Sequence, residues 1–170
     1  KMPLLGAVVN GHVEVVSLLF ANGADAAVED SRGFTLLHFA AQNGHSDVVA
    51  LLLAKGIHAD TRAGSGKTPL MLAGSKDVVA LLLANGANAA ARDDTGSTPL
   101  HYADDMDVAA LLLEYSADVD AKNDRGETPL FYAAADGRTD VASLLLDHKA
   151  DANARPMMAG HRCMPQPSPV

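Results

Sequence analysis

The sequence contains few of the residues that commonly stabilise a small fold, namely cysteines that form disulfides and large aromatic side chains that fill a core. Its single cysteine, Cys163, has no partner for an internal disulfide, so the fold does not depend on an oxidising compartment. An intracellular location, most simply the cytoplasm, fits this composition. Tryptophan is missing and aromatic residues make up only 4% of the chain, whereas 48% of its 170 residues are apolar. A core built mainly from alanine, leucine and valine is typical of small, closely packed helices.

Long apolar runs and an excess of positive charge are also missing. No run approaches the roughly 18 residues that a membrane span requires, so we expect no membrane partner. Thirteen lysines and arginines oppose 21 acidic residues, and the resulting net charge of −8 repels a phosphate backbone, which excludes nucleic acid as the expected partner. No charged and apolar leader opens the chain. Because Lys1 falls midway through a repeating unit, export from a longer precursor stays an open alternative.

The string GSGKT at residues 64–68 is similar to part of a nucleotide-binding P-loop, but it fails two tests. The full motif requires a glycine where this chain has Thr61. The loop must also lead into a helix with free backbone N–H groups, and the next residue, Pro69, has no N–H. We therefore expect no nucleotide cofactor.

An internal repeat explains this string better. Five similar segments begin at Met2, Thr35, Thr68, Thr98 and Thr128, which are 33, 33, 30 and 30 residues apart. The linkers between them, DSRGFT, AGSGKT, DDTGST and NDRGET, keep one glycine in register, and glycine supplies the positive φ angle of a turn. The string GSGKT is therefore predicted to be one copy of a repeated turn.

Each copy carries start and stop signals for two helices. The first helix begins at a pair such as Thr98-Pro99, where the hydroxyl caps the helix and proline takes its first position. The second begins near an acidic residue and continues into a run such as VVALLL, whose wide apolar arc requires a neighbouring repeat on each side. Glycine ends the second helix in the first three copies. Ser116 and Lys149 take that place in the last two, at an expected cost of about 1 kcal/mol each relative to glycine.

These segments, T-P-L-H-x-A-A, G-H, V-V-x-L-L-L and G-A-D, resemble the ankyrin repeat family over about residues 2–155. The resemblance implies an all-α solenoid of helix–turn–helix units with projecting β-turns or hairpin loops. We expect residues 1–155 to form the ankyrin repeat domain, and residues 156–170, rich in proline and methionine, to form a tail or an irregular cap. Met157, Met158 and Met164 either cover the last repeat or belong to a disordered end.

The third and fourth copies depart from the pattern because three residues are missing between their two helices. The segments LAGSKDVV and YADDMDVA show this beside FAAQNGHSDVV. We predict first helices shorter by nearly a turn, a tightened helix–helix turn and a locally indented surface. First helices of ordinary length at residues 69–74 and 99–104 would contradict this prediction.

The histidines recur at equivalent positions but do not indicate a metal site. His38 and His101 are two repeats apart, and one helix layer occupies about 8–10 Å, which is too far for shared coordination. We expect these two side chains, together with His12 and His45, to form hydrogen bonds with adjacent turns.

The remaining candidates for metal or catalytic chemistry are weak. Asp118 and Asp120 begin like a calcium loop, but the later ligands are missing. The acidic residues within 104–107 are interpreted mainly as helix-start and solvating charges, with an ion site as the alternative. His161 and Cys163 have no partner cysteines at zinc spacing. No nucleophile and base can be paired from spacing, so we expect no metal, no cofactor, no catalytic residue and no enzymatic activity.

The resemblance also implies a function: binding of another protein through a concave surface formed by the β-turn tips and the exposed side of the first helices. Carried onto this chain, the surface consists of Ser31, Arg32, Phe34, Phe39, Gln42, Asn43, Ser65, Lys67, Leu72, Thr95, Ser97, Tyr102, Arg125, Glu127, Tyr132 and Asp136. Phe39, Leu72, Tyr102 and Tyr132 share one position of the repeat. Their side chains either fill space between adjacent first helices or form an aromatic strip that anchors the partner.

A self-associating scaffold is the alternative function. Ends of the stack that lack polar caps, such as Val8 and Val9 or the methionine-rich tail, would then pack against another copy of the chain. For the binding module we expect a monomer with at most weak homo-association.

Overall fold

The computed structural model describes residues 2–157, and these residues form ten helices in five consecutive pairs. The helices are α1 (Pro3–Val9), α2 (Val13–Ala21), α3 (Leu36–Gln42), α4 (Ser46–Ala54), α5 (Pro69–Leu72), α6 (Lys76–Ala84), α7 (Pro99–Tyr102), α8 (Met106–Glu114), α9 (Pro129–Ala135) and α10 (Thr139–Asp147). Within the described part of the chain the only strand-like pairing is an isolated bridge between Glu29 and Thr35. The predicted all-α solenoid is confirmed.

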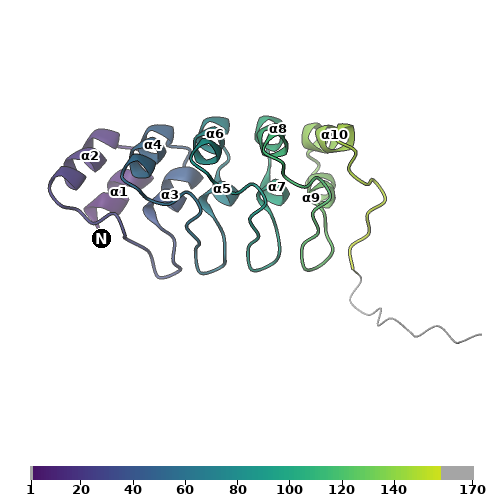
Figure 1. Ribbon diagram of the computed structural model, residues 1–170, viewed down its shortest axis with the longest axis horizontal. Coiled ribbons are helices and arrows are strands. Elements are labelled where there is room, and N and C mark those ends of the chain that lie inside the picture. The colour runs from purple at the N-terminus through teal and green to yellow at the C-terminus, as the bar shows by residue number, and fades with distance from the viewer. Residues whose placement is uncertain (1, 158–170) are drawn as a thin grey trace, which may run out of the picture.

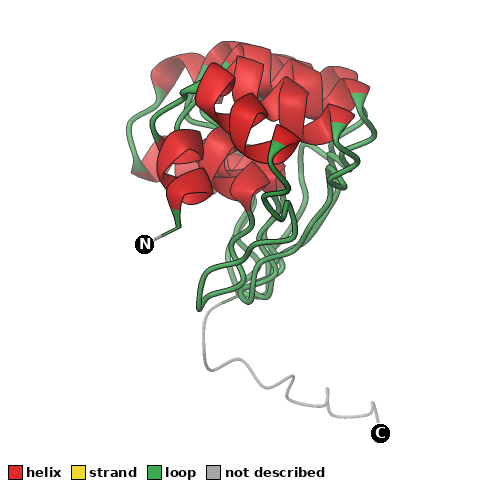
Figure 2. Ribbon diagram, turned by 90° about the vertical axis from the view of Figure 1, so that its left-hand side faces the viewer, coloured by secondary structure: helices red, strands yellow, loops and turns green. Residues whose placement is uncertain are grey.

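The pairs stack side by side, so that the odd-numbered helices form one row and the even-numbered helices a second (Figure 1). The loop between one pair and the next projects as a hairpin beyond the first row, and the hairpins lie close together when the stack is viewed along its length (Figure 2). We name hairpins 1 to 4 by residues 30–34, 63–67, 93–97 and 123–127.

The core lies between the two rows and between neighbouring pairs. Helix α4 buries Val48, Val49 and Leu52 completely, and α6 repeats this pattern one pair later. Because each such side chain contributes about 1.5–3 kcal/mol when fully buried, most of the stability comes from contacts between consecutive pairs. The wide apolar arc of the second helices is explained by neighbours on both flanks, as the sequence predicts.

The predicted ends of the second helices are also confirmed. Gly23, Gly56 and Gly86 follow the first three of these helices with φ angles between 83° and 87°. Ser116 and Lys149 follow the last two with φ angles of 64° and 65°. Both side chains therefore occupy a left-handed conformation that glycine adopts without strain.

The two shortened repeats have shortened first helices. Helices α5 and α7 contain four residues each, whereas α1, α3 and α9 contain seven, so this prediction is confirmed. The predicted tightening of the helix–helix turn is wrong, because three residues join the two helices of every described pair. The turn changes conformation instead. Three missing helical residues remove a rise of about 4.5 Å, and the chain covers it with extended backbone at Ala73 and Ser75, where the ordinary turn has a positive-φ glycine such as Gly44.

Candidate functional site

The hairpins form a continuous edge because each is hydrogen-bonded to the next through the backbone. The bonds run from Gly64 N to Arg32 O at 2.8 Å, from Asp94 N to Ser65 O at 3.1 Å, from Asp124 N to Thr95 O at 3.0 Å and from Met157 N to Arg125 O at 2.7 Å. Two arginines add to this edge, since Arg62 donates to the carbonyl of Arg92 and Arg92 to that of Lys122, both at 2.7 Å. The edge is therefore preorganised rather than a set of independent loops.

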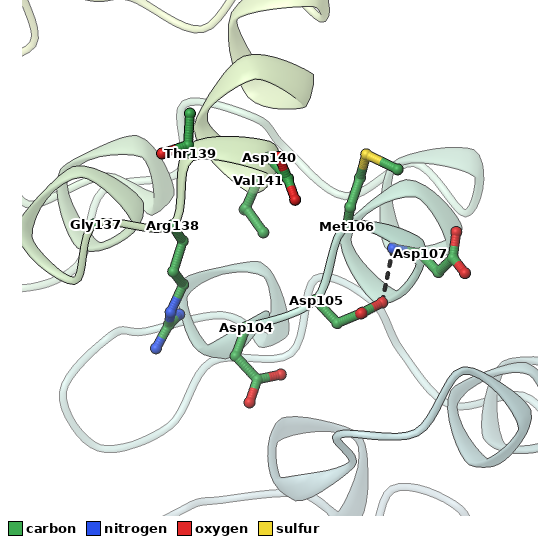
Figure 3. Close-up of a pocket in the computed structure, with 9 residues that line it drawn as sticks. All are labelled: Asp104, Asp105, Met106, Asp107, Gly137, Arg138, Thr139, Asp140 and Val141. Atoms are coloured by element: carbon green, nitrogen blue, oxygen red, sulfur yellow. Dashed lines mark hydrogen bonds between the residues drawn. The ribbon is translucent and has the colours of Figure 1, made fainter.

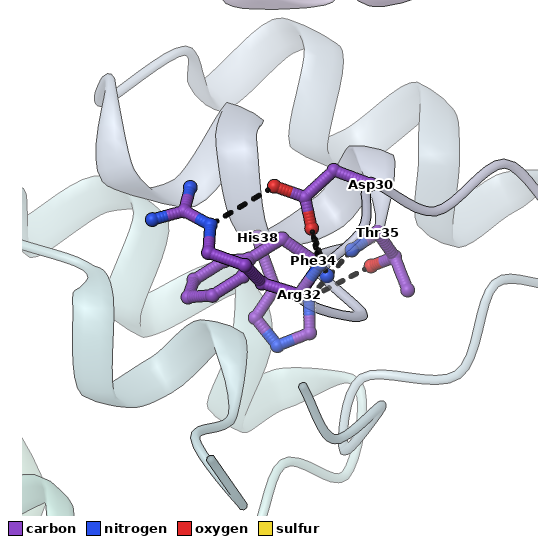
Figure 4. A network of polar contacts seen from close by, with 5 residues as sticks. All are labelled: Asp30, Arg32, Phe34, Thr35 and His38. Carbon is purple, nitrogen blue, oxygen red and sulfur yellow. Dashed lines mark hydrogen bonds and ion pairs between the residues drawn. The ribbon is translucent and has the colours of Figure 1, made fainter. Parts of the chain in front are cut away.

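Three of the four hairpins are closed internally by an acidic or amide side chain at their first residue. In hairpin 1, Asp30 Oδ1 accepts from the N–H groups of Arg32 and Phe34, both at 2.9 Å (Figure 4). The hydrogen bond from Phe34 is the main reason that the pKa of Asp30 lies below its ordinary value. Asp93 and Asn123 play the same part in hairpins 3 and 4. Sequence reasoning missed these residues, although the linkers begin with D, A, D and N in register.

Two histidines connect the first helices to the next hairpin. His38 Nδ1 lies 2.9 Å from the Thr35 hydroxyl (Figure 4). His38 Nε2 lies 2.9 Å from the carbonyl oxygen of Lys67. His101 makes the equivalent contacts two repeats later, in the fourth repeat. His45 Nε2 lies 2.9 Å from the carbonyl oxygen of Val9. The predicted bonding to adjacent turns is confirmed for these three, whereas His12 makes no such bond among the described residues.

Two residues at the shared position of the repeat, Tyr102 and Tyr132, connect their first helix to the preceding hairpin. The Tyr102 hydroxyl donates to Asp93, and the Tyr132 hydroxyl donates to Glu127 at 2.8 Å. Burial, assisted by the bond to Asp93, raises the pKa of Tyr102 to about 12. The rings of Phe39, Tyr102 and Tyr132 are half-buried, so they support the hairpins and still present part of their surface.

Two hollows lie between consecutive hairpins. A hollow of about 610 Å³ between hairpins 1 and 2 is lined by Arg32, Phe34, Gly64, Ser65 and Lys67, and it is called the cationic hollow below. The Arg32 guanidinium lies 4.8 Å from the centre of the Phe34 ring, and the Lys67 ammonium 4.5 Å from that of Tyr102. A smaller hollow of about 340 Å³ lies between hairpins 3 and 4, and its lining includes Tyr102 and Tyr132.

The repeated helix pairs and projecting hairpins agree with a comparison against known families. The model of the family described as ankyrin repeats (3 copies) matches residues 4–93 and 74–156. The chain belongs to the ankyrin repeat family. Ankyrin repeat proteins generally bind other proteins and are typically not enzymes. Curated proteins give no significant match to the chain.

The predicted partner-binding residues of this ankyrin repeat protein fall into two groups. Most lie on the hairpins or beside them on the first helices, and are exposed or half-buried. Gln42, Asn43 and Asp136 lie instead at the opposite ends of α3 and α9, where Asn43 and Asp136 are the C-cap residues. The structure therefore does not bring these three together with the hairpin residues.

The assignment of Ser97 to the exposed surface is wrong. Ser97 is only 2% exposed, its hydroxyl accepts a hydrogen bond from the Thr95 hydroxyl at 3.0 Å, and its N–H donates to Asp93. The Ser97 hydroxyl also accepts from the side-chain amide of Asn123 in the adjoining hairpin, at 3.5 Å.

The ankyrin turn also accounts for GSGKT. Gly66 N donates to the carbonyl oxygen of Ala63 within hairpin 2, Gly64 N donates to hairpin 1, and Pro69 begins α5. The φ angle of Gly66 is 72°, close to those of Gly33 and Gly96 in equivalent turns. The predicted structural role of the string is confirmed.

A third hollow lies on the other side of the stack, where the shortened fourth repeat meets the longer fifth one. Its volume is about 550 Å³, and Asp104 and Asp105 face Arg138 and Asp140 across it (Figure 3). The hollow is the local indentation that the missing residues predict. Arg138 spans the junction between the fourth and fifth repeats, because its side chain donates to the carbonyl oxygen of Ala103 at 3.0 Å. It also forms an ion pair with Asp136 at 2.7 Å.

The acidic residues at this junction stabilise the start of a helix. Asp105 is the N-cap of α8 and accepts from the N–H groups of Asp107 and Val108. Asp118 accepts from the N–H of Asp120 within its own turn. Residues 2–157 contain no group of three or more His, Cys, Asp or Glu side chains arranged to hold a metal ion. Met158, His161, Cys163 and Met164 lie outside the described residues.

Within residues 2–157 of this ankyrin repeat protein, no helix is both long and apolar enough to cross a bilayer.

Proposed function

We propose that this ankyrin repeat protein binds a partner protein through the hairpin edge and the adjoining side of its first helices, and catalyses no reaction. The observation that carries the proposal is the row of hydrogen-bonded hairpins with hollows between them, lined by half-buried aromatic rings and exposed polar side chains. Tyrosine and arginine are enriched among the residues that dominate binding energy at interfaces. The edge supplies both, with Tyr102, Tyr132, Arg32 and Arg125.

Preorganisation supports the same proposal. The hydroxyls of Tyr102 and Tyr132 are held by Asp93 and Glu127, and the hairpins are held by one another. Little backbone ordering of this chain would therefore be required on binding, since the surface that a partner meets is already ordered. Affinity would come from a few anchor side chains rather than from coupled folding.

A peptide-display selection against the chain tests the proposal. The edge variant combines Thr95→Arg with Arg125→Ala, which is tolerated because arginine already occupies the same turn position at Arg32 and Arg125. The control combines Ala84→Arg with Lys76→Ala on exposed positions of α6 and has the same net charge. Selected peptides should lose binding to the edge variant and keep it to the control. Equal binding to both variants, or recovery of no peptide, contradicts the proposal.

Self-association through the ends of the stack is the second candidate, and the structure changes the residues that would carry it. Val8 is completely buried in α1, so its assignment to an open end is wrong. Val15 and Leu18 of α2 favour the idea instead, because they are 45% and 63% exposed. Light scattering over a dilution series tests it: a molecular mass that stays monomeric at every concentration contradicts the scaffold.

A further inference from the structure

Hairpin 2 lacks the internal acceptor that closes the other three hairpins. Ala63 stands where Asp30, Asp93 and Asn123 stand elsewhere, and a methyl group accepts no hydrogen bond. In the other hairpins one side-chain oxygen accepts from the N–H groups two and four residues later. In hairpin 2 these groups belong to Ser65 and Lys67, and no acceptor among residues 2–157 is bonded to either.

The same two residues line the cationic hollow, whose charge is opposite to that of the chain. Its charged lining residues are Arg32 and Lys67, although the chain carries a net charge of −8. The Arg32 guanidinium uses only Nε on Asp30, at 3.2 Å, and its side chain is 69% exposed. Lys67 lies over the Tyr102 ring and forms no ion pair with a described carboxylate. The hollow is thus lined by two residues whose backbone N–H groups have no acceptor within residues 2–157, Ser65 and Lys67, and by two cationic side chains, Arg32 and Lys67.

We propose that the cationic hollow binds the carboxylate of a glutamate or aspartate side chain from the partner protein. One carboxylate oxygen accepts from the N–H groups of Ser65 and Lys67, in place of the side chain that Ala63 lacks. The other oxygen faces the Lys67 ammonium and the free end of the Arg32 guanidinium, where charge-assisted bonds are strongest. The Phe34 ring packs against the methylene groups of the bound side chain. This inference rests on the proposed function and names the partner as an acidic segment.

The smaller hollow, between hairpins 3 and 4, is unfavourable for binding a carboxylate. Its charged lining residues are Asp94, Asp124 and Arg125, and Asn123 already accepts from the two N–H groups of hairpin 4. Selectivity along the edge therefore comes from two differences between the hollows: alanine in place of aspartate or asparagine at the first hairpin position, and cationic rather than mainly acidic lining residues.

Ala63→Asp is the sharpest variant because it supplies the missing acceptor within the chain. Hairpin 2 has the same turn geometry as hairpins 1 and 3, as the φ angles of Gly66, Gly33 and Gly96 show. The new side chain should occupy the N–H groups of Ser65 and Lys67, so the melting temperature rises while carboxylate binding is lost. A variant that is more stable and binds less cannot be explained by misfolding.

The experiment is a titration of the 15N-labelled chain with N-acetyl-glutamate methylamide, followed through the backbone amide signals. We expect saturable shifts at Ser65 and Lys67, no saturation with N-acetyl-glutamine methylamide, and loss of the shifts in Ala63→Asp. Lys67→Gln should raise the Kd about fivefold, whereas Lys76→Gln, a matched change on α6, should leave it unchanged. Unsaturable shifts, or shifts that persist in Ala63→Asp, overturn the inference.

Two further outcomes separate this inference from others. Inorganic phosphate that binds Ser65 and Lys67 more tightly than the glutamate probe overturns it in favour of a phosphoryl group. Selected peptides that bind the hairpin edge but ignore Ala63→Asp overturn it while the proposed function stands. Conversely, a glutamate probe that binds hairpin 2 while selected peptides ignore the edge variant supports the site and contradicts the proposed function.

Discussion

The His38 Nε2 atom lies 2.9 Å from the carbonyl oxygen of Lys67, 29 residues later in the sequence. On the other side of the ring, Nδ1 accepts from the Thr35 N–H at 3.1 Å. An atom that accepts carries no proton, so the ring is neutral with its hydrogen on Nε2 and donates to Lys67. One neutral side chain thus completes a helix cap and joins two repeats.

Acid should destabilise the fold through His38 and His101. Burial lowers the pKa of both below the ordinary 6.5. Well above pH 6.5 both rings are neutral in the folded and unfolded chain, and their contribution is fully present. Below it the unfolded chain binds protons that the folded protein does not, so the unfolding free energy falls by at most about 1.4 kcal/mol per pH unit for each histidine.

Urea unfolding at pH 7.5, 6.5 and 5.5 measures this loss. The double variant His38→Gln, His101→Gln should be less stable at pH 7.5 and should lose less stability on acidification. Asp30, Asp93 and Glu127 have pKa values lowered from 3.8, 3.8 and 4.5, so their contributions are lost mainly below those values, at a lower pH than this window. Equal pH dependence in the double variant would show that these rings are not responsible.

Met71→His should stabilise the third repeat. The Thr68 hydroxyl is buried without a hydrogen-bond partner among the described residues, because Met71 occupies the position of His38 and His101. A histidine there would bond Thr68 on one side and the carbonyl oxygen of Ser97 on the other. We expect a gain of about 1 kcal/mol, measured by urea unfolding.

A pair of threonine variants checks the same reasoning. Thr98→Val should destabilise by about 1 kcal/mol because it removes the hydroxyl of a complete capping box. Thr68→Val should be neutral or stabilising, since it removes a buried hydroxyl that has no partner. Equal losses in the two variants would contradict the assignment.

Ser116→Gly and Lys149→Gly should each raise the unfolding free energy by about 1 kcal/mol. Both residues have φ angles near 65°, which glycine adopts without a steric penalty. The control is Gly86→Ala, where no atom lies within 4 Å of the added methyl group, so the expected loss of similar size reflects the backbone alone. Thermal unfolding measures all three, and a loss on introducing glycine would refute the idea.

Arg138→His should weaken the contact between the fourth and fifth repeats. Histidine is the residue found at this turn position in His45, where it reaches the carbonyl oxygen of Val9 in an unshortened repeat. In the shortened fourth repeat the corresponding carbonyl belongs to Ala103, which the longer arginine reaches. We expect a loss of about 1 kcal/mol. Arg125→His, an exposed arginine on a hairpin, should leave stability unchanged by comparison.

The sequence predicted features that depend on neighbours along the chain. Thr98-Pro99 begins a helix because capping and the fixed φ of proline act within one turn. The short α5 and α7 follow directly from three missing residues. The hydrogen bond of His38 to an adjacent turn was predicted as well, because repeat geometry places that turn within reach.

Three other features, all of which depend on the adjoining repeat, were missed or predicted wrongly. Ser97 was expected on the surface and is buried against hairpin 4, because its exposure is set by Asn123 of the next hairpin. The extended link at Ala73 replaced the expected tighter turn, since the chain must still reach a second helix fixed by its neighbours. Arg138 contacts Ala103 because a shortened repeat lies beside a longer one.

By itself the sequence determined the period, the helix boundaries and the left-handed stops, because each is fixed by local backbone sterics and by hydrogen bonds within a few residues. Tertiary structure alone decided which side chains remain open on the hairpin edge, and that Arg32 and Lys67 line one hollow together with the uncapped hairpin 2. The physical reason is that side-chain exposure and charge environment arise where consecutive repeats meet, about 30 residues apart in the chain.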